Sequence, residues 1–394
     1  MNEQKVNKRI LALDILRGIT IAGMIMVNNP GSWGHIYAPL RHAEWNGFTP
    51  TDLVFPFFMF IMGISTYISL KKYNFEFSQS AIIKILKRTI VIFLIGCAIG
   101  WFSRFCRYWV SAPEDLSFFE NLWASVWTFD RMRILGVMQR LALCYGVASI
   151  VALTVKHKRI PYIIASLLIG YFVILMCGNG YEYNETNILS VVDRAILTPV
   201  HMYKDNGIDP EGLLSTIPSI AHVLLGFYVG KLMLEGNKSQ DRMSFLNSQI
   251  IILFLVGTIL TFSGLLLSYG CPINKKIWSP TFVLTTCGLA SSFLALLIWI
   301  IDVKGKKKWS LFFEAFGVNP LFMYVLGGVL SILFGCIRFP WEDGMISIHT
   351  FLYKIVMVPI FGQTGGSLAF ALLFVTINWC IGYQLYKRKI YIKI

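Results

Sequence analysis

Long apolar runs separated by short polar segments recur along the whole chain, and this pattern predicts a helical membrane protein. A membrane-crossing helix needs about 20 mostly apolar residues. We place such spans at residues 10–28, 52–70, 84–103, 134–154, 160–177, 213–233, 245–268, 279–301, 311–335 and 367–386. The predicted fold is all-α, a polytopic membrane protein with about ten transmembrane helices in one domain covering residues 1–394.

A further apolar stretch, "FLYKIVMVPIF" at residues 351–361, is too short to cross a bilayer. It also contains Lys354 and Pro359, a charge and a helix breaker. We predict a re-entrant or interfacial segment here.

Composition supports a membrane protein, because 56% of the 394 residues are hydrophobic and 14% are charged. Soluble domains average about 45–50% apolar and about 25% charged residues. The first apolar run contains Asp14 and Arg17 without a small-residue cleavage pattern after it, so we expect a permanent span rather than a signal peptide. The eight cysteines form no CxxC pair and no His-linked spacing, so no metal site is predicted.

The net charge of +14 comes from basic residues in short loops rather than in one basic domain. This distribution favours a role in membrane orientation over nucleic-acid binding. With the N-terminus inside, 22 of the 35 Lys and Arg residues fall in loops on the side of the termini and 11 on the opposite side. We therefore predict cytoplasmic termini. The opposite loops are longer, so we expect the functional site on the outer face.

The segment "RHAEWNGFTPTDLVFPFFMFIMG", residues 41–63, gathers hydrogen-bonding groups at the start of the second span. Its "TPTD" makes Thr49 a candidate N-cap and places Asp52 near the positive end of the helix. His42 lies in the loop just before, beside Trp45 and Asn46. A carboxylate within reach of a histidine sets its tautomer and raises its basicity, so we predict a catalytic pair. The alternatives are a plain helix cap for Asp52 and a solvated surface histidine.

Several predicted spans contain polar groups, and such groups usually face a bundle interior or a wet cavity. They are Asp14, Arg17, Gln139, Arg140, His222, Glu314 and Asn319. Asp14 and Arg17 can pair because they lie three residues apart on a helix. Together these residues predict a polar cavity, and the alternative for each is a hydrogen bond between helices.

Outer loops add further candidates. Asp209 and Glu211 precede the 213–233 span, again at a positive helix end. In "INKKIW", Lys275 and Lys276 can pair with phosphate, and Trp278 can stack on a flat ring. All three can equally be interfacial anchors.

The motifs, in order, resemble the heparan-α-glucosaminide N-acetyltransferase family, membrane-embedded enzymes that acetylate amino sugars across a membrane. They are "LALDILRGITIAGMIMVNN", "HAEWNGFTPTDLVFPFFMFIMG", "RILGVMQRLALCYG", "IDPEGLLSTIPSIAHVLLGFYVGK" and "NKKIWSPTFVLTTCGLASSFLALLIWIID". The resemblance runs from about residue 9 to the C-terminus and implies a single transmembrane acyltransferase domain. Lysosomal members carry a lumenal domain and a span before it that this chain lacks. It therefore resembles a bacterial-type member, expected in a bacterial inner membrane.

The resemblance assigns the family's catalytic histidine to His42, its carboxylate to Asp52 and an important asparagine to Asn28. It implies acetyl-CoA as co-substrate, the amine of an extracytoplasmic glucosamine unit as acceptor, and a homodimer. Without the lumenal domain, a free amino sugar or a cell-wall fragment is a more plausible acceptor than polymeric heparan sulfate. We predict acetyl-CoA contacts from Arg133, Gln139, Arg140, Lys275 and Lys276, and acceptor contacts from Trp45, Asn46, Asp209 and Glu211.

Two mechanisms fit these residues: His42 is either a base or a transient acetyl carrier. Two other functions also fit. Intramembrane His, Asp and Arg build proton relays in transporters, so a transporter of a small sugar or acid is one alternative. An O-acyltransferase acting on glycan hydroxyls is the other.

Overall fold

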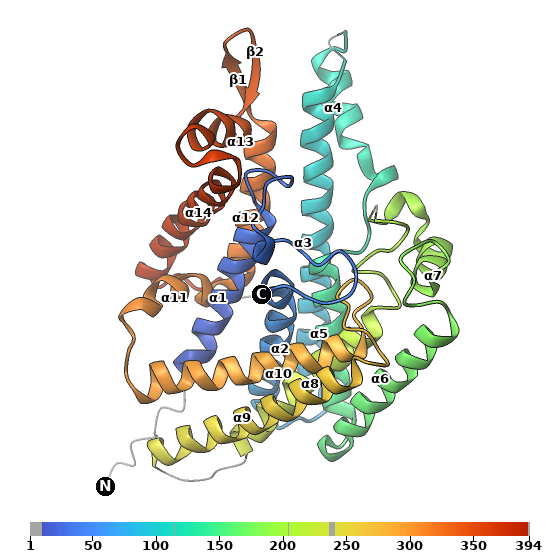
Figure 1. The fold of residues 1–394 in the computed structure, drawn as a ribbon, viewed down its shortest axis with the longest axis vertical. Coiled ribbons are helices and arrows are strands. Elements are labelled where there is room, and N and C mark those ends of the chain that lie inside the picture. Colours follow the sequence, from blue (N-terminus) through green and yellow to red (C-terminus); the bar gives the residue numbers. More distant parts are fainter. Residues whose placement is uncertain (1–9, 114, 204, 236–240, 393–394) are drawn as a thin grey trace.

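The structure, a computed structural model, describes residues 10–113, 115–203, 205–235 and 241–392. Helices make up most of it (Figure 1). The α-helices are α1 (Leu11–Asn28), α2 (Pro50–Lys71), α3 (Gln79–Ser111), α4 (Phe118–Val126), α5 (Val137–Thr154), α6 (Ile160–Cys177), α7 (Ile188–Leu197), α8 (Thr216–Glu235), α9 (Arg242–Leu267), α10 (Pro280–Leu297), α11 (Leu311–Val318), α12 (Pro320–Cys336), α13 (Ile348–Thr350) and α14 (Val358–Lys387).

Shorter elements complete the described chain. Strands β1 (Arg338–Trp341) and β2 (Gly344–Ser347) form an antiparallel hairpin after α12. Two π-helical segments, Ile298–Val303 and Phe351–Met357, follow α10 and precede α14. Short 3-10 turns occupy Ala38–Leu40, Thr128–Arg131, His157–Arg159, Pro199–His201 and Lys308–Ser310.

The predicted fold class is confirmed, because eight helices of the described chain are long and apolar enough to cross a membrane. The bent pair α11 and α12 makes up to nine, so nine of the ten predicted spans correspond to such helices. The predicted span 84–103 does not, because it lies inside α3, which is not among them. Only 15 residues separate Arg88 from Arg104 in α3, fewer than the about 20 that a span needs.

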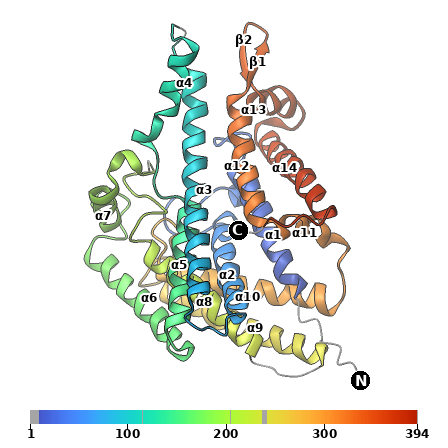
Figure 2. The same ribbon diagram turned by 180° about the vertical axis from the view of Figure 1, so that it is seen from behind.

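The predicted span 311–335 is a broken helix. Residues 308–318 and α12 meet at 80° around Asn319 and Pro320. The Asn319 side chain donates to the carbonyl of Ile390 (2.8 Å) and accepts from the N–H of Ile392 (2.8 Å), so the end of the chain satisfies the break. α12 then runs beside α3, and both views show the pair (Figure 1, Figure 2).

The segment 351–361 is separate from the last span, as predicted. Gly362, at φ 71°, interrupts the helical backbone directly after it. This left-handed conformation suits glycine because a Cβ atom would be strained there. The structure does not test whether the segment re-enters the bilayer.

Helices α2 and α8 pack with their backbones close together in the core. A Cβ atom on Gly63 would lie 2.2 Å from the carbonyl oxygen of Val223, and one on Gly226 would lie 2.3 Å from that of Phe60. Backbones that approach so closely need glycine at both positions, as is common in membrane helix pairs. This contact fixes α2, whose first turn carries Asp52, against the rest of the bundle.

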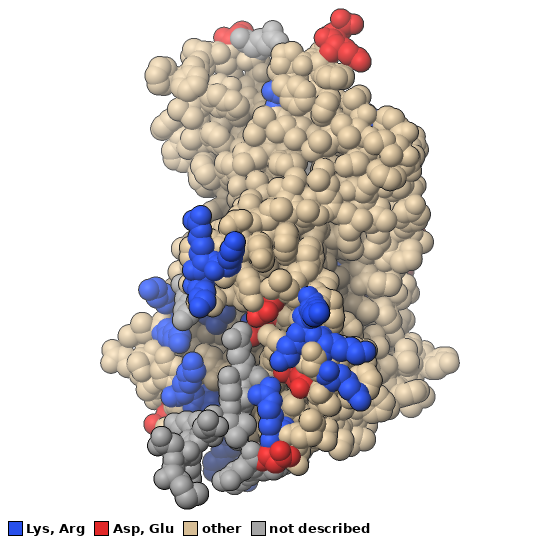
Figure 3. Space-filling view, turned by 90° about the vertical axis from the view of Figure 1, so that its left-hand side faces the viewer, with Lys and Arg blue, Asp and Glu red and all other residues tan. Residues whose placement is uncertain are grey.

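Basic side chains gather on one face. Figure 3 shows Lys and Arg over the lower half of this face and few above. The loop 304–308 and residues 387–389 at the end of α14 are exposed and rich in lysine. Both belong to the side that the charge count assigns to the cytoplasm, which stays a prediction.

Candidate active site

The first turn of α2 holds Asp52 as a fixed hydrogen-bond acceptor. Its Oδ2 accepts from the backbone N–H groups of Thr49 and Ala43, both at 3.0 Å. Thr49 is the N-cap, as predicted, and Pro50 opens the helix. The side chain of Asp52 is only 1% exposed, so its position is set by the protein rather than by solvent.

His42 and Lys275 meet at the other oxygen of this carboxylate. His42 Nδ1 lies 2.6 Å from Asp52 Oδ1, and Lys275 Nζ lies 3.2 Å from the same oxygen. Lys275 Nζ is also 3.1 Å from His42 Nδ1. Because a carboxylate only accepts hydrogen bonds, the pairing assigns the ring proton to Nδ1, which leaves the Nε2 lone pair free to take a proton.

Two loops that are far apart in sequence carry these groups, and backbone pairing joins them. The N–H of Gly47 donates to the carbonyl of Ile273 (2.6 Å), and the Asn274 side chain donates to Asn46 Oδ1 (3.3 Å). The loop before α2 therefore moves together with the loop before α10. This pairing keeps His42 and Lys275 in register.

A cavity of about 530 Å³ opens onto this group. Its polar lining comes from the end of α1, the loop before α2, the segment before α5, the loops around 203–211 and the loop before α10. These residues are Asn28, Arg41, His42, Glu44, Thr51, Asp52, Arg133, Asp205, Glu211, Lys275 and Lys276. Its size is within the range of small-molecule and cofactor sites.

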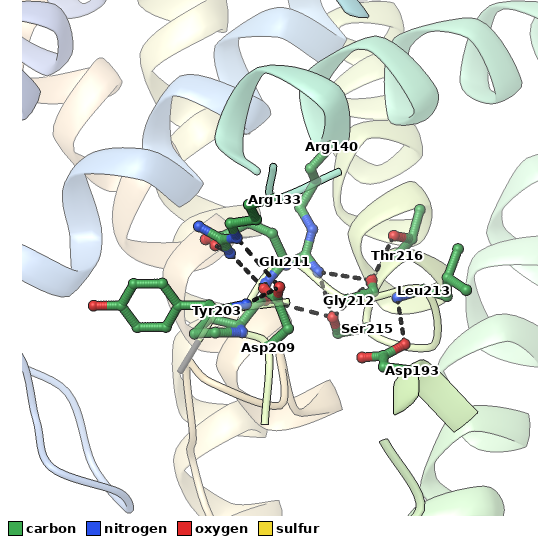
Figure 4. Close-up of polar contacts among 11 residues, drawn as sticks. Arg133, Arg140, Asp193, Tyr203, Asp209, Glu211, Gly212, Leu213, Ser215 and Thr216 are labelled. Carbon is green, nitrogen blue, oxygen red and sulfur yellow. Dashed lines mark hydrogen bonds and ion pairs between the residues drawn. The ribbon is translucent and has the colours of Figure 1, made fainter. Parts of the chain in front are cut away.

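Arg133 forms one wall of the cavity through two carboxylates (Figure 4). Its guanidinium pairs with Asp209 through Nε (3.2 Å) and Nη2, and with Glu211 Oε2 at 2.6 Å. It also lies over the ring of Tyr203, 4.9 Å from the ring centroid. Burial opposes ionisation of Glu211, but Arg133 and Arg140 hold the pKa of this carboxyl below its usual range.

A comparison of sequences places this arrangement in a known family. The sequence model described as heparan-alpha-glucosaminide N-acetyltransferase, catalytic, matches residues 9–262, more than half of the chain. The chain belongs to this family. The match includes His42, Asp52 and Arg133 but ends before Lys275.

Two curated relatives carry the name heparan-alpha-glucosaminide N-acetyltransferase. The protein of Homo sapiens is 27% identical over 368 residues, covering 80% of this chain and 52% of the human protein. The protein of Mus musculus is 26% identical over 441 residues, covering 98% of this chain and 60% of the mouse protein. The chain thus spans about half to three-fifths of the length of these relatives.

The structure brings together seven of the site residues that were predicted from the sequence. They are Asn28, His42, Asp52, Arg133, Glu211, Lys275 and Lys276, all lining this cavity. The three predicted acetyl-CoA contacts among them, Arg133, Lys275 and Lys276, each have an acidic partner. Lys276 Nζ, for example, lies 2.8 Å from Asp205. Free cations for a phosphate are therefore not provided by these side chains.

Five predicted contact residues do not line this cavity. Trp45 stacks on Tyr183, with ring centroids 4.6 Å apart, and Asn46 binds Asn274. Asp209 is fully buried behind Arg133. These three residues build the walls rather than the cavity surface.

Gln139 and Arg140, predicted as coenzyme contacts, also lie behind the cavity. Arg140 is 1% exposed and donates to the carbonyl of Gly212 (3.2 Å) and to Ser215 (Figure 4). Its guanidinium lies over the ring of Trp278. Gln139 is buried and donates to Cys97 Sγ at 3.6 Å. Both side chains join helices and loops, the alternative considered for intramembrane polar groups.

Sequence reasoning gave no role to several of the other lining residues, and four of these offer chemistry to a ligand. Trp33 and Tyr203 line the cavity yet are 65% and 51% exposed, and Glu44 and Asp205 add carboxylates. Large aromatic side chains in the polar loops "NPGSWG" and "HMYKDNG" were a signal that could have pointed to them.

A second cavity of about 560 Å³ surrounds the other end of α2. Arg17 lies in it, paired with Asp14 at 3.1 Å as predicted and donating to Ser65 Oγ at 2.8 Å. Lys71 and Lys72 also line it. Between the two cavities α2 is packed into the core, where Phe60 is fully buried.

Proposed function

We propose that this chain transfers the acetyl group of acetyl-CoA to the amine of a glucosamine-type sugar. The observation that carries the proposal is the contact between His42 and Asp52 at the cavity. Both residues lie within the part of the chain that matches the family. The names of the human and mouse relatives support the same reaction class.

The chemistry needs an uncharged amine, because an ammonium has no lone pair with which to attack a thioester. His42 Nε2 takes the proton of the attacking amine while Nδ1–H stays bonded to Asp52. The new bond joins the amine nitrogen to the acetyl carbon. The bond from this carbon to sulfur then breaks, and the leaving thiolate takes the proton from the imidazolium.

The oxyanion formed on the way needs hydrogen-bond donors. Asn28 lines the cavity at the end of α1 and is the side-chain donor we assign to it. Asn46 does not line the cavity, and its Oδ1 accepts from Asn274. In the alternative scheme His42 itself carries the acetyl group, and the kinetics are then ping-pong.

We place the acceptor in the outer cavity. Trp33 and Tyr203 offer aromatic surfaces for a sugar ring, and Glu44 offers a carboxylate for its ammonium. A carboxylate binds an ammonium by charge as well as by a hydrogen bond, which favours an amino sugar over a hydroxyl acceptor.

We place the phosphates of the donor at the inner cavity. Lys71 and Lys72 face it beside the Arg17–Asp14 pair. In the cavity at His42, by contrast, Arg133, Lys275 and Lys276 are all held by carboxylates. In the orientation predicted from loop charges, this end of α2 is cytoplasmic. The packing around Phe60 must then open during turnover so that the acetyl group reaches His42.

The test is release of free CoA by the purified protein with acetyl-CoA, with and without glucosamine, beside His42→Ala. Glucosamine-dependent release that the variant lacks supports the proposal. Glucose in place of glucosamine is the control for hydroxyl acylation. Background release by the wild type across a panel of amino sugars refutes the proposal for these acceptors, and uptake of the same sugars into vesicles then tests transport.

A further inference from the structure

Lys275 occupies an unusual place for a residue predicted to bind phosphate. Its ammonium lies 3.2 Å from Asp52 Oδ1 and 3.1 Å from His42 Nδ1, and its side chain is only 18% exposed. A lysine that binds phosphate would have to leave Asp52. It would then leave a buried carboxylate without its cation, which is costly.

The loop around Lys275 is built to hold it. Asn274 and Trp278 on either side are buried, and the N–H of Trp278 donates to the carbonyl of Lys275 (3.0 Å). Trp278 adopts φ 53°, which a large side chain rarely does and which persists only where the surroundings enforce it. The turn therefore fixes Lys275 rather than leaving it free to follow a ligand.

The positive charge of Lys275 affects the histidine beside it. A carboxylate beside a histidine stabilises the imidazolium. A neighbouring opposite charge typically shifts a pKa by about 1–3 units. A histidine protonated at neutral pH cannot act as a base. A fixed ammonium next to the same carboxylate cancels this effect, since it balances Asp52 and repels a second positive charge on the ring.

We infer that Lys275 is a positioning residue that keeps the imidazole of His42 uncharged and its Nδ1–H directed at Asp52. The inference rests on the proposed function, in which His42 must be neutral to work. The same ammonium repels the imidazolium that forms during the reaction, and this favours transfer of its proton to the departing thiolate.

Other charged residues near His42 are paired elsewhere or exposed, so Lys275 is the cation we assign to this role. Arg133 is paired with Asp209 and Glu211, and Lys276 with Asp205. Arg41 and Glu44 line the rim and are exposed. Burial lowers the pKa of Lys275, and Asp52 and Glu211 oppose that shift, which ties its charge to these partners.

The experiment compares Lys275→Met, Lys275→Arg and Lys276→Met with the wild type. The first readout is kcat/KM for the amino sugar against pH. We expect Lys275→Met to move the acid limb to higher pH by about one unit, which is a roughly tenfold loss on that limb. Lys275→Arg restores the limb, and Lys276→Met leaves it in place. An unmoved limb together with a raised KM for acetyl-CoA in Lys275→Met overturns the inference.

The second readout does not depend on turnover. Diethyl pyrocarbonate modifies neutral imidazole, and peptide mass spectrometry follows its reaction at His42 across pH. In Lys275→Met the midpoint of this reaction moves upward if the inference holds, and an unmoved midpoint in protein of wild-type thermal stability overturns it. A moved midpoint in a protein that acetylates no amino sugar supports the role of Lys275 and refutes the proposed function.

Discussion

Asp52 Oδ1 lies 2.6 Å from His42 Nδ1, and this contact links a loop residue to the first turn of α2. The other carboxylate oxygen caps the helix through Thr49. One side chain therefore serves both purposes that the sequence left as alternatives, a cap and a partner for histidine. The helix end orients the imidazole.

Asp52→Asn tests this relationship. The amide oxygen can still cap α2, but its NH₂ group presents a donor to His42 and favours the wrong tautomer. We expect kcat of the folded protein to fall by about 10²–10⁴-fold. Thermal stability also falls, because Lys275 loses its charge partner. Asp130→Asn is the matched control, since this exposed carboxylate pairs with Arg131 and does not line the cavity. Equal losses in the two variants would contradict an orienting role for Asp52.

Arg140→Met tests whether Arg140 binds the coenzyme. The side chain is buried against Trp278 and bonded to Gly212 and Ser215. We expect lower thermal stability, because these partners lose their donor, and an unchanged KM for acetyl-CoA in the folded fraction. A tenfold rise in KM at wild-type stability would restore the coenzyme contact predicted from sequence.

Sequence reasoning found the parts of the site that lie next to one another along the chain. The cap at Thr49 and Asp52 and the pairing of Asp14 with Arg17 depend on local helix geometry, and both were predicted. The joining of the loops at Gly47 and Asn274 was not predictable, because nothing in either segment signals the other.

The burial of individual side chains was also not predictable from the sequence. Arg140 and Lys275 are both cations beside apolar residues, and pattern alone gives them the same role. Only packing shows that Arg140 lies behind the loop at Gly212, whereas Lys275 faces His42. The broken helix at Asn319 reads as one apolar run for the same reason, since the chain end that satisfies it is distant in sequence.

The buried carboxyl of Asp193 should make the free energy of unfolding depend on pH. Burial raises the pKa of this carboxyl to about 6, although its Oδ1 accepts from the N–H of Leu213 at 2.8 Å. The folded state therefore binds its proton more tightly than the unfolded state, so stability rises as pH falls through 6. We expect a gain of about 1 kcal/mol from pH 7.5 to 5.5 from this group.

The measurement is the thermal midpoint in detergent at the two pH values, for the wild type and Asp193→Asn. The amide keeps an acceptor for Leu213 and cannot titrate. Other groups contribute equally to both proteins, so the difference between them isolates Asp193. A wild type and variant with the same pH response would refute the assignment.

Gly63→Ala tests the close approach of α2 and α8. The added Cβ would lie 2.2 Å from the carbonyl oxygen of Val223, so the helices must separate. We expect a destabilisation of about 1–3 kcal/mol, read as a lower thermal midpoint. Gly170→Ala on α6 is the control, because its Cβ would meet nothing within 4 Å and alanine favours a helix. Similar midpoints for both variants would show that α2 and α8 can move apart freely.

Orientation in the membrane decides which compartment each cavity faces. Single cysteines at Lys306→Cys and Glu44→Cys, in a background without the eight native free cysteines, report the two sides. Because short basic loops stay in the cytoplasm, we expect an impermeant maleimide on intact spheroplasts to label Glu44→Cys alone. Both variants must label after permeabilisation. The opposite pattern would put His42 on the cytoplasmic side, where donor and acceptor would enter through one mouth, and no acetyl group would have to pass Phe60.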